Sequence, residues 1–243
     1  NTLFTTTELR EAVAGPGVGA IYTEPKFREI LDASVRPLYE TKGRLKVSFP
    51  SITVSPAKGV SGLAVTVQVN EGEEFQLRSV EFAEKPEAES PLSPVLLKEG
   101  KFATGQVANM TQVKEGVAAL EQSLRRKGYL EVKSKTIRKL DDAAKAIDVK
   151  LDLDPGPQFT FRKLTIEGLD IQTEPHIRKL WAVKMGQPFN TEYPDFFLAK
   201  LREDDIFENL GRTKSVVVPD PGAGTVDVTL IFEGDKKPPK KEQ

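Results

Sequence analysis

The chain has 243 residues, of which 38% are hydrophobic and 29% are charged, a composition typical of folded globular proteins. Its 35 basic and 36 acidic residues nearly cancel, which argues against a surface built for nucleic acid, because such surfaces concentrate basic residues. The absence of cysteine excludes disulfides and thiolate chemistry. No apolar run reaches the roughly 18 residues that a membrane-spanning helix needs.

The first third of the chain predicts two helices followed by two strands. A short helix is expected over residues 6–14 and a longer one over residues 23–38, in which Pro37 should kink or shorten the last turn. Residues 43–47 and 63–70 alternate between polar and apolar positions, as half-buried strands do. No strand pattern precedes the first helix, so the sheet of this region is expected to lack its opening strand.

The middle third predicts strands over residues 75–82, 129–138 and 147–154. A short helix is expected over residues 92–98, and a long one over residues 107–124 that stops before a glycine. The apolar residues of the long helix recur every three or four positions and predict one buried stripe. They are Val107, Met110, Val113, Val117, Leu120 and Leu124.

The last third repeats the same order of elements. Strands are expected over residues 159–166, 211–216 and 226–232. Helices are expected over residues 174–183 and over residues 190–210, the second capped by its first or second residue and carrying Phe197, Leu201 and Leu210 on its apolar face.

One motif occurs twice, each time after an alternating strand that ends in a turn containing glycine. The two copies are Phe75-x-Leu77-Arg78-x-Val80-x-Phe82 and Phe159-x-Phe161-Arg162-x-Leu164-x-Ile166. Such self-similarity predicts a tandem array of modules of about 80 residues. We place the modules at residues 1–72, 73–156 and 157–235, followed by a Pro/Lys tail over residues 236–243 that is expected to be disordered. Repeated modules generally offer extended binding surfaces and not a single catalytic cleft.

The residues that could carry catalysis or bind a metal form no convincing group. His176 is the only histidine, and it is expected on the surface of a helix. Residues 15–19 resemble a phosphate-binding loop but lack its Lys-Ser/Thr, so a plain turn is favoured. The pairs Asp141-Asp142 and Asp204-Asp205 are expected to be solvated charges. The sequence therefore predicts no enzyme, no metal site and no cofactor.

Three aromatic residues of the last third leave two interpretations open. Trp181, Phe196 and Phe197 could form an exposed contact surface, or they could pack in the core or at an interface between modules. Packing is favoured, because aromatic side chains bury the largest area in small domains.

The order and repetition of these motifs resemble the POTRA (polypeptide-transport-associated) domain. The resemblance is carried by Glu71-Gly72-x-x-Phe75, by Pro155-Gly156-Pro157-x-Phe159, by Leu120-x-x-x-Leu124-x-x-x-Gly128-Tyr129 and by Gly186-Gln-Pro-Phe189. It implies an α+β fold of tandem β-α-α-β-β modules, each with a three-stranded mixed sheet packed on two helices.

The same resemblance implies a function and a location. POTRA domains form the periplasmic arm of outer-membrane barrel proteins that assemble other barrels or translocate polypeptides. Partners would be unfolded outer-membrane or exported polypeptides and accessory assembly proteins, with a C-terminal barrel in the full-length protein. Neither nucleic acid nor a membrane span is expected in this chain. The alternative is a structural spacer or interaction module of an envelope or cell-division complex.

Such modules would bind clients through the edges of their sheets. If the last strand of a module lies centrally, the strand after the long helix becomes an edge with unpaired backbone groups, and an extended guest can add to it. In the second module this edge is expected over residues 129–138. The candidate polypeptide-binding residues are Tyr129, Leu130, Glu131, Val132, Lys133, Lys135 and Ile137. The alternative is that the lysines only protect the edge from aggregation.

Overall fold

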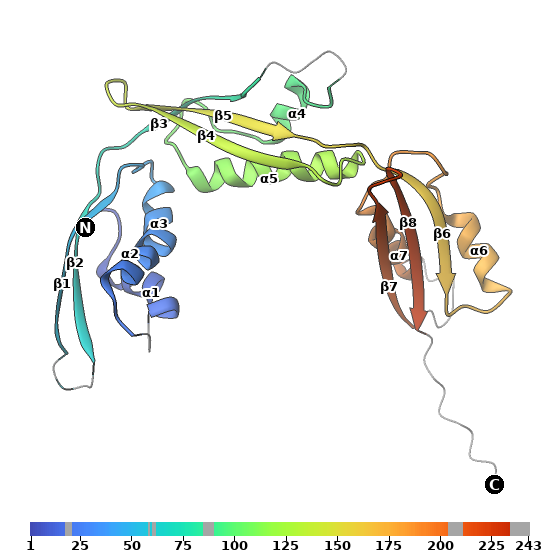
Figure 1. The fold of residues 1–243 in the computed structure, drawn as a ribbon, viewed down its shortest axis with the longest axis horizontal. Coiled ribbons are helices and arrows are strands. Elements are labelled where there is room, and N and C mark those ends of the chain that lie inside the picture. The colour runs from blue at the N-terminus through green and yellow to red at the C-terminus, as the bar shows by residue number, and fades with distance from the viewer. Residues whose placement is uncertain (18–20, 58, 60–61, 85–89, 204–210, 234–243) are drawn as a thin grey trace, which may run out of the picture. The chain divides into compact units, whose positions relative to one another are not determined.

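A computed structural model describes residues 1–17, 21–57, 59, 62–84, 90–203 and 211–233 (Figure 1). The chain divides into two compact units. One comprises residues 1–88, 93–119 and 135–152, and the other comprises residues 89–92, 120–134 and 153–243. The strands form three separate sheets, each described here with its own helices.

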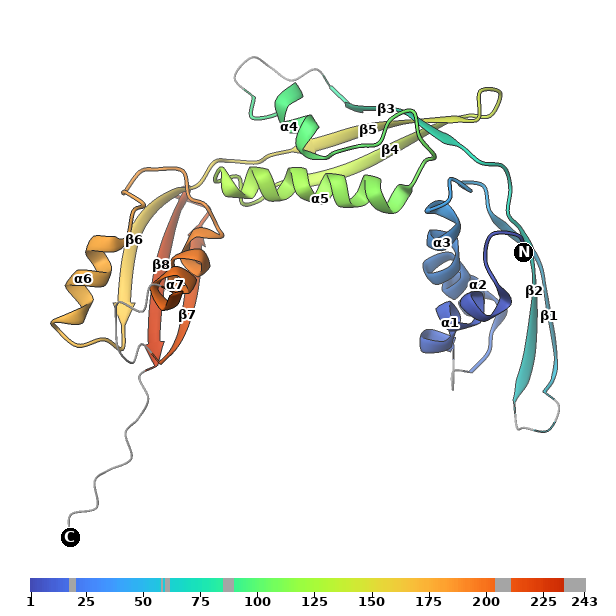
Figure 2. The same ribbon diagram turned by 180° about the vertical axis from the view of Figure 1, so that it is seen from behind.

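The first sheet has two antiparallel strands, β1 (Ser48–Pro56) and β2 (Leu63–Asn70). Four helical segments lie along one face of this hairpin (Figures 1 and 2). They are α1 (Thr6–Gly17), α2 (Glu24–Ile30), the π-helical segment η1 (Leu31–Val35) and α3 (Arg36–Glu40). Their core contains Leu31, Val35, Tyr39, Val47 and Phe49, all of which are buried.

The predicted disturbance at Pro37 takes the form of a π-helical turn. Because proline has no backbone N–H, it cannot continue the regular hydrogen-bond pattern of an α-helix. The preceding residue, Arg36, donates its N–H to the carbonyl of Leu31, five residues back, which is a π-helical bond. The expected single helix over residues 23–38 is thereby divided into α2, η1 and α3.

The second sheet contains β3 (Gln76–Phe82), β4 (Lys133–Asp141) and β5 (Ala146–Asp154) in the order β3-β5-β4. Strand β3 runs parallel to β5, and the short connection 142–145 makes β4 and β5 a hairpin. Two helices accompany the sheet, α4 (Pro94–Glu99) and α5 (Met110–Arg126), and α5 lies along one face (Figure 2).

Helix α5 buries the stripe that its sequence predicts. Asn109 caps its first turn, accepting hydrogen bonds from the N–H groups of Thr111 and Gln112 at 3.1 Å. Every stripe residue inside the helix is at most 6% exposed; these are Met110, Val113, Val117, Leu120 and Leu124. Val107 lies before the helix and is 39% exposed.

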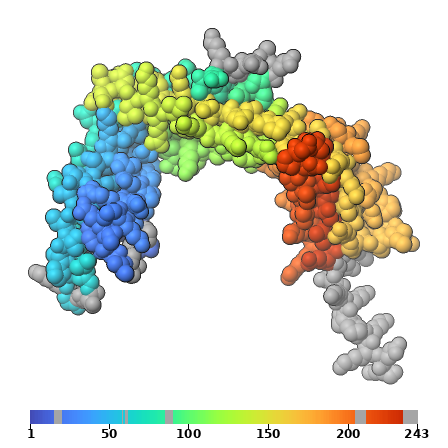
Figure 3. All heavy atoms as spheres, viewed as in Figure 1, coloured from blue at the N-terminus to red at the C-terminus, as the bar shows by residue number. Residues whose placement is uncertain are grey.

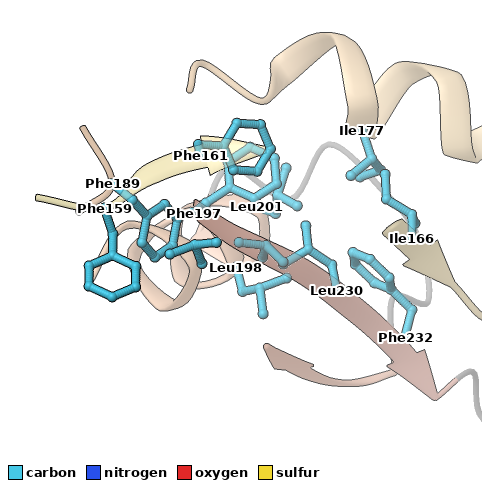
Figure 4. Close-up of a cluster of buried hydrophobic side chains, with 12 residues drawn as sticks. Phe159, Phe161, Ile166, Ile177, Phe189, Phe197, Leu198, Leu201, Leu230 and Phe232 are labelled. Atoms are coloured by element: carbon cyan, nitrogen blue, oxygen red, sulfur yellow. The ribbon is translucent and has the colours of Figure 1, made fainter. Parts of the chain in front are cut away.

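The third sheet repeats the second. Strands β6 (Thr160–Glu167), β7 (Arg212–Asp220) and β8 (Thr225–Glu233) take the order β6-β8-β7, with β6 parallel and β7 antiparallel to β8. Helices α6 (Thr173–Leu180) and α7 (Tyr193–Glu203) complete it. Figure 4 shows the rings of Phe159 and Phe189 at one end of the buried core and Phe232 with Ile166 at the other.

The third strand of each complete sheet is central, as the sequence analysis expected, whereas two edge strands begin later than predicted. The stretch 43–47 and the first residues of the stretch 129–138 were expected to be extended, but β1 begins at Ser48 and β4 at Lys133. Gly43 and Gly128 have φ of +72° and +94° and turn the chain before the strand can start. The predicted Leu210 and the tail 236–243 lie outside the described residues.

Gly128 also contacts the start of the third sheet. Its carbonyl accepts a hydrogen bond from the N–H of Phe159 at 2.8 Å, and a Cβ at position 128 would lie 2.7 Å from the carbonyl oxygen of Phe159. Phe159 itself is fully buried. Gly43 and Phe75 repeat this contact, with an N–H to carbonyl distance of 2.9 Å. Only glycine lets the two backbones come this close.

We expect Gly128→Ala to destabilise its unit more than Gly186→Ala. Gly186 also has a positive φ, +81°, but a Cβ there meets nothing within 4 Å. Both variants incur the left-handed backbone penalty of about 1–2 kcal/mol, and only Gly128→Ala adds a steric clash. Urea unfolding followed by the fluorescence of Trp181, the only tryptophan, measures both. Equal losses of stability would contradict the backbone contact.

Candidate polypeptide-binding edges

Strand β4 is an edge of the second sheet, with β5 as its one neighbour among the described residues. Its outer backbone groups therefore have no partner strand, and its side chains from Lys133 to Lys139 are all exposed. Figure 3 shows the yellow-green atoms of β4 and β5 at the surface. A strand exposed on both faces and along its outer edge is accessible to an extended guest chain.

The seven predicted site residues fall into two groups. Lys133, Lys135 and Ile137 lie on β4, where alternation places them on the same face. That face points away from α5, because Ser134, on the opposite face, donates a hydrogen bond to Glu121 of α5 at 2.5 Å. Ile137 is 42% exposed, which makes it an apolar position within a line of lysines.

Tyr129, Leu130, Glu131 and Val132 lie in the turn before the strand, and their backbone is partly engaged there. The N–H of Tyr129 bonds to the carbonyl of Leu124 at 3.0 Å, and that of Leu130 to the carbonyl of Gly128 at 3.1 Å. Val132 is 7% exposed, and Leu130 packs against the core of the third sheet. The accessible edge is therefore residues 133–141, shorter than the predicted range 129–138.

The motif shared by the second and third sheets places an arginine between two aspartates in each. Arg162 on β6 binds Asp227 of β8 at 2.8 Å through both Nε and Nη2, and Asp220 at 3.1 Å. Arg78 on β3 binds Asp148 of β5 at 2.5 Å and Asp141 at 3.0 Å. Each arginine thus links the first strand to the central strand and to the end of the edge strand. Asp141, predicted to be simply solvated, is one of these partners.

These ion pairs shift the acidity of their carboxyl groups. The hydrogen bond from Arg162 holds the pKa of Asp227 below its ordinary value, and that from Arg78 does the same for the pKa of Asp148. For Asp141 the backbone N–H of Ala144 is the larger cause of the lowered pKa, followed by Arg78. All three carboxylates are partly exposed, so their contribution to stability is reduced by solvent screening.

We expect Arg162→Gln to raise the pKa of Asp227 toward its ordinary value, because the main stabiliser of the carboxylate is removed. The matched control is Lys163→Gln, since Lys163 is the weakest of the groups that lower this pKa. A lowered folded-state pKa stabilises the fold above the ordinary pKa of aspartate, and this stabilisation is lost as the pH falls through the folded-state value. Carboxyl carbon NMR titration measures both variants. Equal shifts would contradict the assignment.

The aromatic residues of the third sheet divide between core and surface. Phe197 is buried, and the ring of Trp181 contacts it at 5.2 Å and Tyr193 at 4.8 Å between centroids. Phe196 is 62% exposed. His176 lies exposed on α6, and its Nδ1 is 2.8 Å from the carbonyl of Gln172.

Within the described residues, no group of three or more His, Cys, Asp or Glu side chains could hold a metal ion. In the same part of the chain, no helix has both the length and the apolar character needed to cross a bilayer. The candidate site described above is a set of sheet edges, and the class of protein that the fold defines is a tandem α+β array with exposed edge strands.

Comparisons with known proteins show what the chain is similar to. The POTRA family model, described as a surface antigen variable number repeat, matches residues 93–156. The crystal structure of BamA POTRA3-5 from Haemophilus influenzae matches with a TM-score of 0.57 and 22% identity, over 88% of this chain and 83% of that chain. The predicted resemblance is confirmed: the chain has the fold of POTRA domains, and residues 93–156 match the POTRA family model.

Two further structures match with lower scores. BamA from Haemophilus ducreyi lacking POTRA domains 1-3 matches with a TM-score of 0.49 and 16% identity, over 67% of this chain and 29% of that chain. POTRA1-3 of the periplasmic domain of Omp85 from Anabaena matches with a TM-score of 0.36 and 17% identity, over 96% of this chain and 91% of that chain.

Proposed function

We propose that the chain is a periplasmic arm of three POTRA-like modules, residues 1–72, 73–156 and 157–235, in a protein that assembles outer-membrane barrels or translocates polypeptides. The arm binds unfolded client polypeptides and accessory assembly proteins by strand addition and has no enzymatic activity. The observation that carries this proposal is the exposed edge strand β4, whose outer backbone groups face no other strand of the described chain.

Strand addition suits clients of many sequences. The guest is held mainly by main-chain hydrogen bonds, which do not depend on side-chain identity. The face of β4 with Lys133, Lys135 and Ile137 adds a modest preference for guests that alternate acidic and apolar residues. Strand β7, the edge of the third sheet, offers a second such site with Lys214, and two weak sites in one chain raise the overall avidity.

The second candidate is a structural spacer whose modules contact fixed partners without binding unfolded chains. Two observations favour it. The lysines of β4 are a common protection of edge strands against aggregation. The repeated backbone contacts of Gly43 with Phe75 and of Gly128 with Phe159 are what a rigid spacer would need.

An NMR titration with an extended peptide derived from a barrel strand separates the two candidates. Client binding predicts shifts of backbone amides confined to residues 133–141 and, at higher peptide concentration, to β7. The spacer predicts none. Shifts on helix α5 alone would contradict strand addition as well.

Two neighbouring proline variants sharpen this test. Because N–H groups alternate in direction along a strand, one of Lys135→Pro and Thr136→Pro removes an N–H that points outward, and the other removes one that pairs with β5. We expect the outward variant to keep its fold, judged by circular dichroism, and to lose the peptide-induced shifts. Val132 is unsuited to this purpose because it is buried before the strand begins. Unchanged binding in the folded variant would argue against main-chain pairing.

A further inference from the structure

The second and third sheets have equivalent loops between their two helices. The N–H of Leu77 donates to the carbonyl of Gln106, and the N–H of Phe161 donates to the carbonyl of Gln187, each at 2.8 Å. Gln106 therefore corresponds to Gln187, and each neighbouring residue corresponds to the one 81 positions later in the chain. The same offset aligns the ends of α4 and α6 and the asparagines that precede α5 and α7. The two regions can thus be compared residue by residue.

Beside the third sheet, aromatic rings fill the space between the two helices. Trp181 directly follows α6, and its ring centroid lies 4.8 Å from that of Tyr193 and 5.2 Å from that of Phe197. The ring of Phe161 is a further neighbour, 5.8 Å from Trp181. Phe197 is buried, and Trp181 and Tyr193 are partly buried and pack against the same core. The end of α6 and the first two turns of α7 are therefore joined by stacked and edge-on rings.

Beside the second sheet, none of the three helix-side positions carries a ring. The equivalents of the tryptophan, the tyrosine and the buried phenylalanine are, in chain order, Gly100, Gln112 and Gly116. Gly100 directly follows α4, and the other two lie in the first two turns of α5. One ring lies nearby, that of Phe102, which is partly exposed and contacts both glycines, since a Cβ added at either glycine would clash with it. One ring thus stands here where the third sheet has several.

A groove of about 310 Å³ lies at these positions, and all three of them line it. Sites for small ligands start at about 300 Å³, so the groove has room for one large side chain and little more. The two glycines are buried in it, whereas its charged lining residues are exposed. These are Glu99, Lys101 and Glu115. Two carboxylates and one ammonium group give the rim of the groove an acidic balance.

We propose that this groove binds one aromatic side chain of a partner polypeptide, and that basic residues flank this side chain in the partner. The bound ring takes the place that Trp181 has beside the third sheet and stacks on Phe102. Glu115 at the rim attracts the flanking basic side chain. No residue of the edge 133–141 lines the groove, so this site is independent of β4 and stands if strand addition there fails.

A second copy of this chain is a less suitable partner. Among the described residues, the one aromatic side chain in the exposed class is Phe196, which is 62% exposed. It follows Asp195, whose carboxylate would be repelled by the acidic rim of the groove. Charge complementarity therefore favours a different, basic polypeptide.

The probe is a blocked tripeptide with tryptophan between two lysines. Titrated into the isotope-labelled chain, it should shift the amide signals of Gln112, Glu115 and Gly116 and the ring signals of Phe102 in NMR spectra. Replacing its tryptophan with leucine should weaken binding about tenfold, because the aromatic contact and part of the buried area are lost. Shifts confined to β4 or β7, no shifts, or equal affinities for the two peptides would overturn the proposal.

Two neighbouring tyrosine variants of α5 test whether the groove is the site. Gln112→Tyr supplies the ring that Tyr193 supplies beside the third sheet, so it should fill the groove and weaken binding of the tryptophan peptide by at least about tenfold. Thr111→Tyr is the matched control, because Thr111 is exposed and does not line the groove, and it should bind as the unchanged protein does. Circular dichroism verifies the fold of both. Equal affinities for the two folded variants would overturn the proposal.

The basic character of the partner has its own test, which does not depend on the tyrosine variants. Glu115→Gln should weaken binding of the lysine-flanked peptide about twofold, the size expected for an exposed ion pair, and should strengthen binding of a glutamate-flanked version. Unchanged affinity for both peptides would overturn the choice of a basic partner.

Sedimentation of the chain without peptide tests the second copy. A monomer that binds the tryptophan peptide supports the proposal. A concentration-dependent dimer that Phe196→Ser abolishes would assign the groove to a second copy and overturn it.

Discussion

Two-sided pairing of the third strand is the constraint on which the second and third sheets depend. Strands β5 and β8 alternate apolar and polar residues, and their apolar faces are almost completely buried. That burial requires a neighbouring strand on each side. In the third sheet the neighbours of β8 are the parallel strand β6 and the antiparallel strand β7, and in the second sheet the neighbours of β5 are β3 and β4. The burial of apolar area is the dominant favourable contribution to the free energy of folding. The helices therefore pack against this apolar face.

The same constraint creates the candidate binding sites. Once the third strand is central, the second strand has one free edge, which no change of side chains can remove. The side chains of β4 from Lys133 to Lys139 are exposed and leave its outer backbone accessible. In the first sheet, β2 has one neighbouring strand among the described residues, and its valines are half-buried.

The arginine of the repeated motif connects the three strands of its sheet. Arg78 and Arg162 occupy the same position of their copies and bind aspartates of two further strands. Bidentate arginine–carboxylate pairs have a defined geometry, so these contacts specify the register of the first strand against the central one. Their exposure keeps their net stabilisation small. In a sheet with one buried face the register of the strands must be specified, because a shift of one residue would expose the apolar side chains.

The periodicity of the sequence by itself predicted most of the helices and strands of the chain and their repetition, and the resemblance to POTRA domains implied the central position of the third strand. Buried stripes such as that of α5 follow from spacing alone, because the 3.6-residue period and the two-residue period leave distinct patterns. The tertiary structure decided where β4 begins, since the turn at Gly128 depends on its contact with Phe159, a residue of the next sheet. It also decided that Asp141 pairs with Arg78 and that Gly100 and Gly116 border an open groove. Such features depend on which segments meet in space, and no local pattern of residues encodes that.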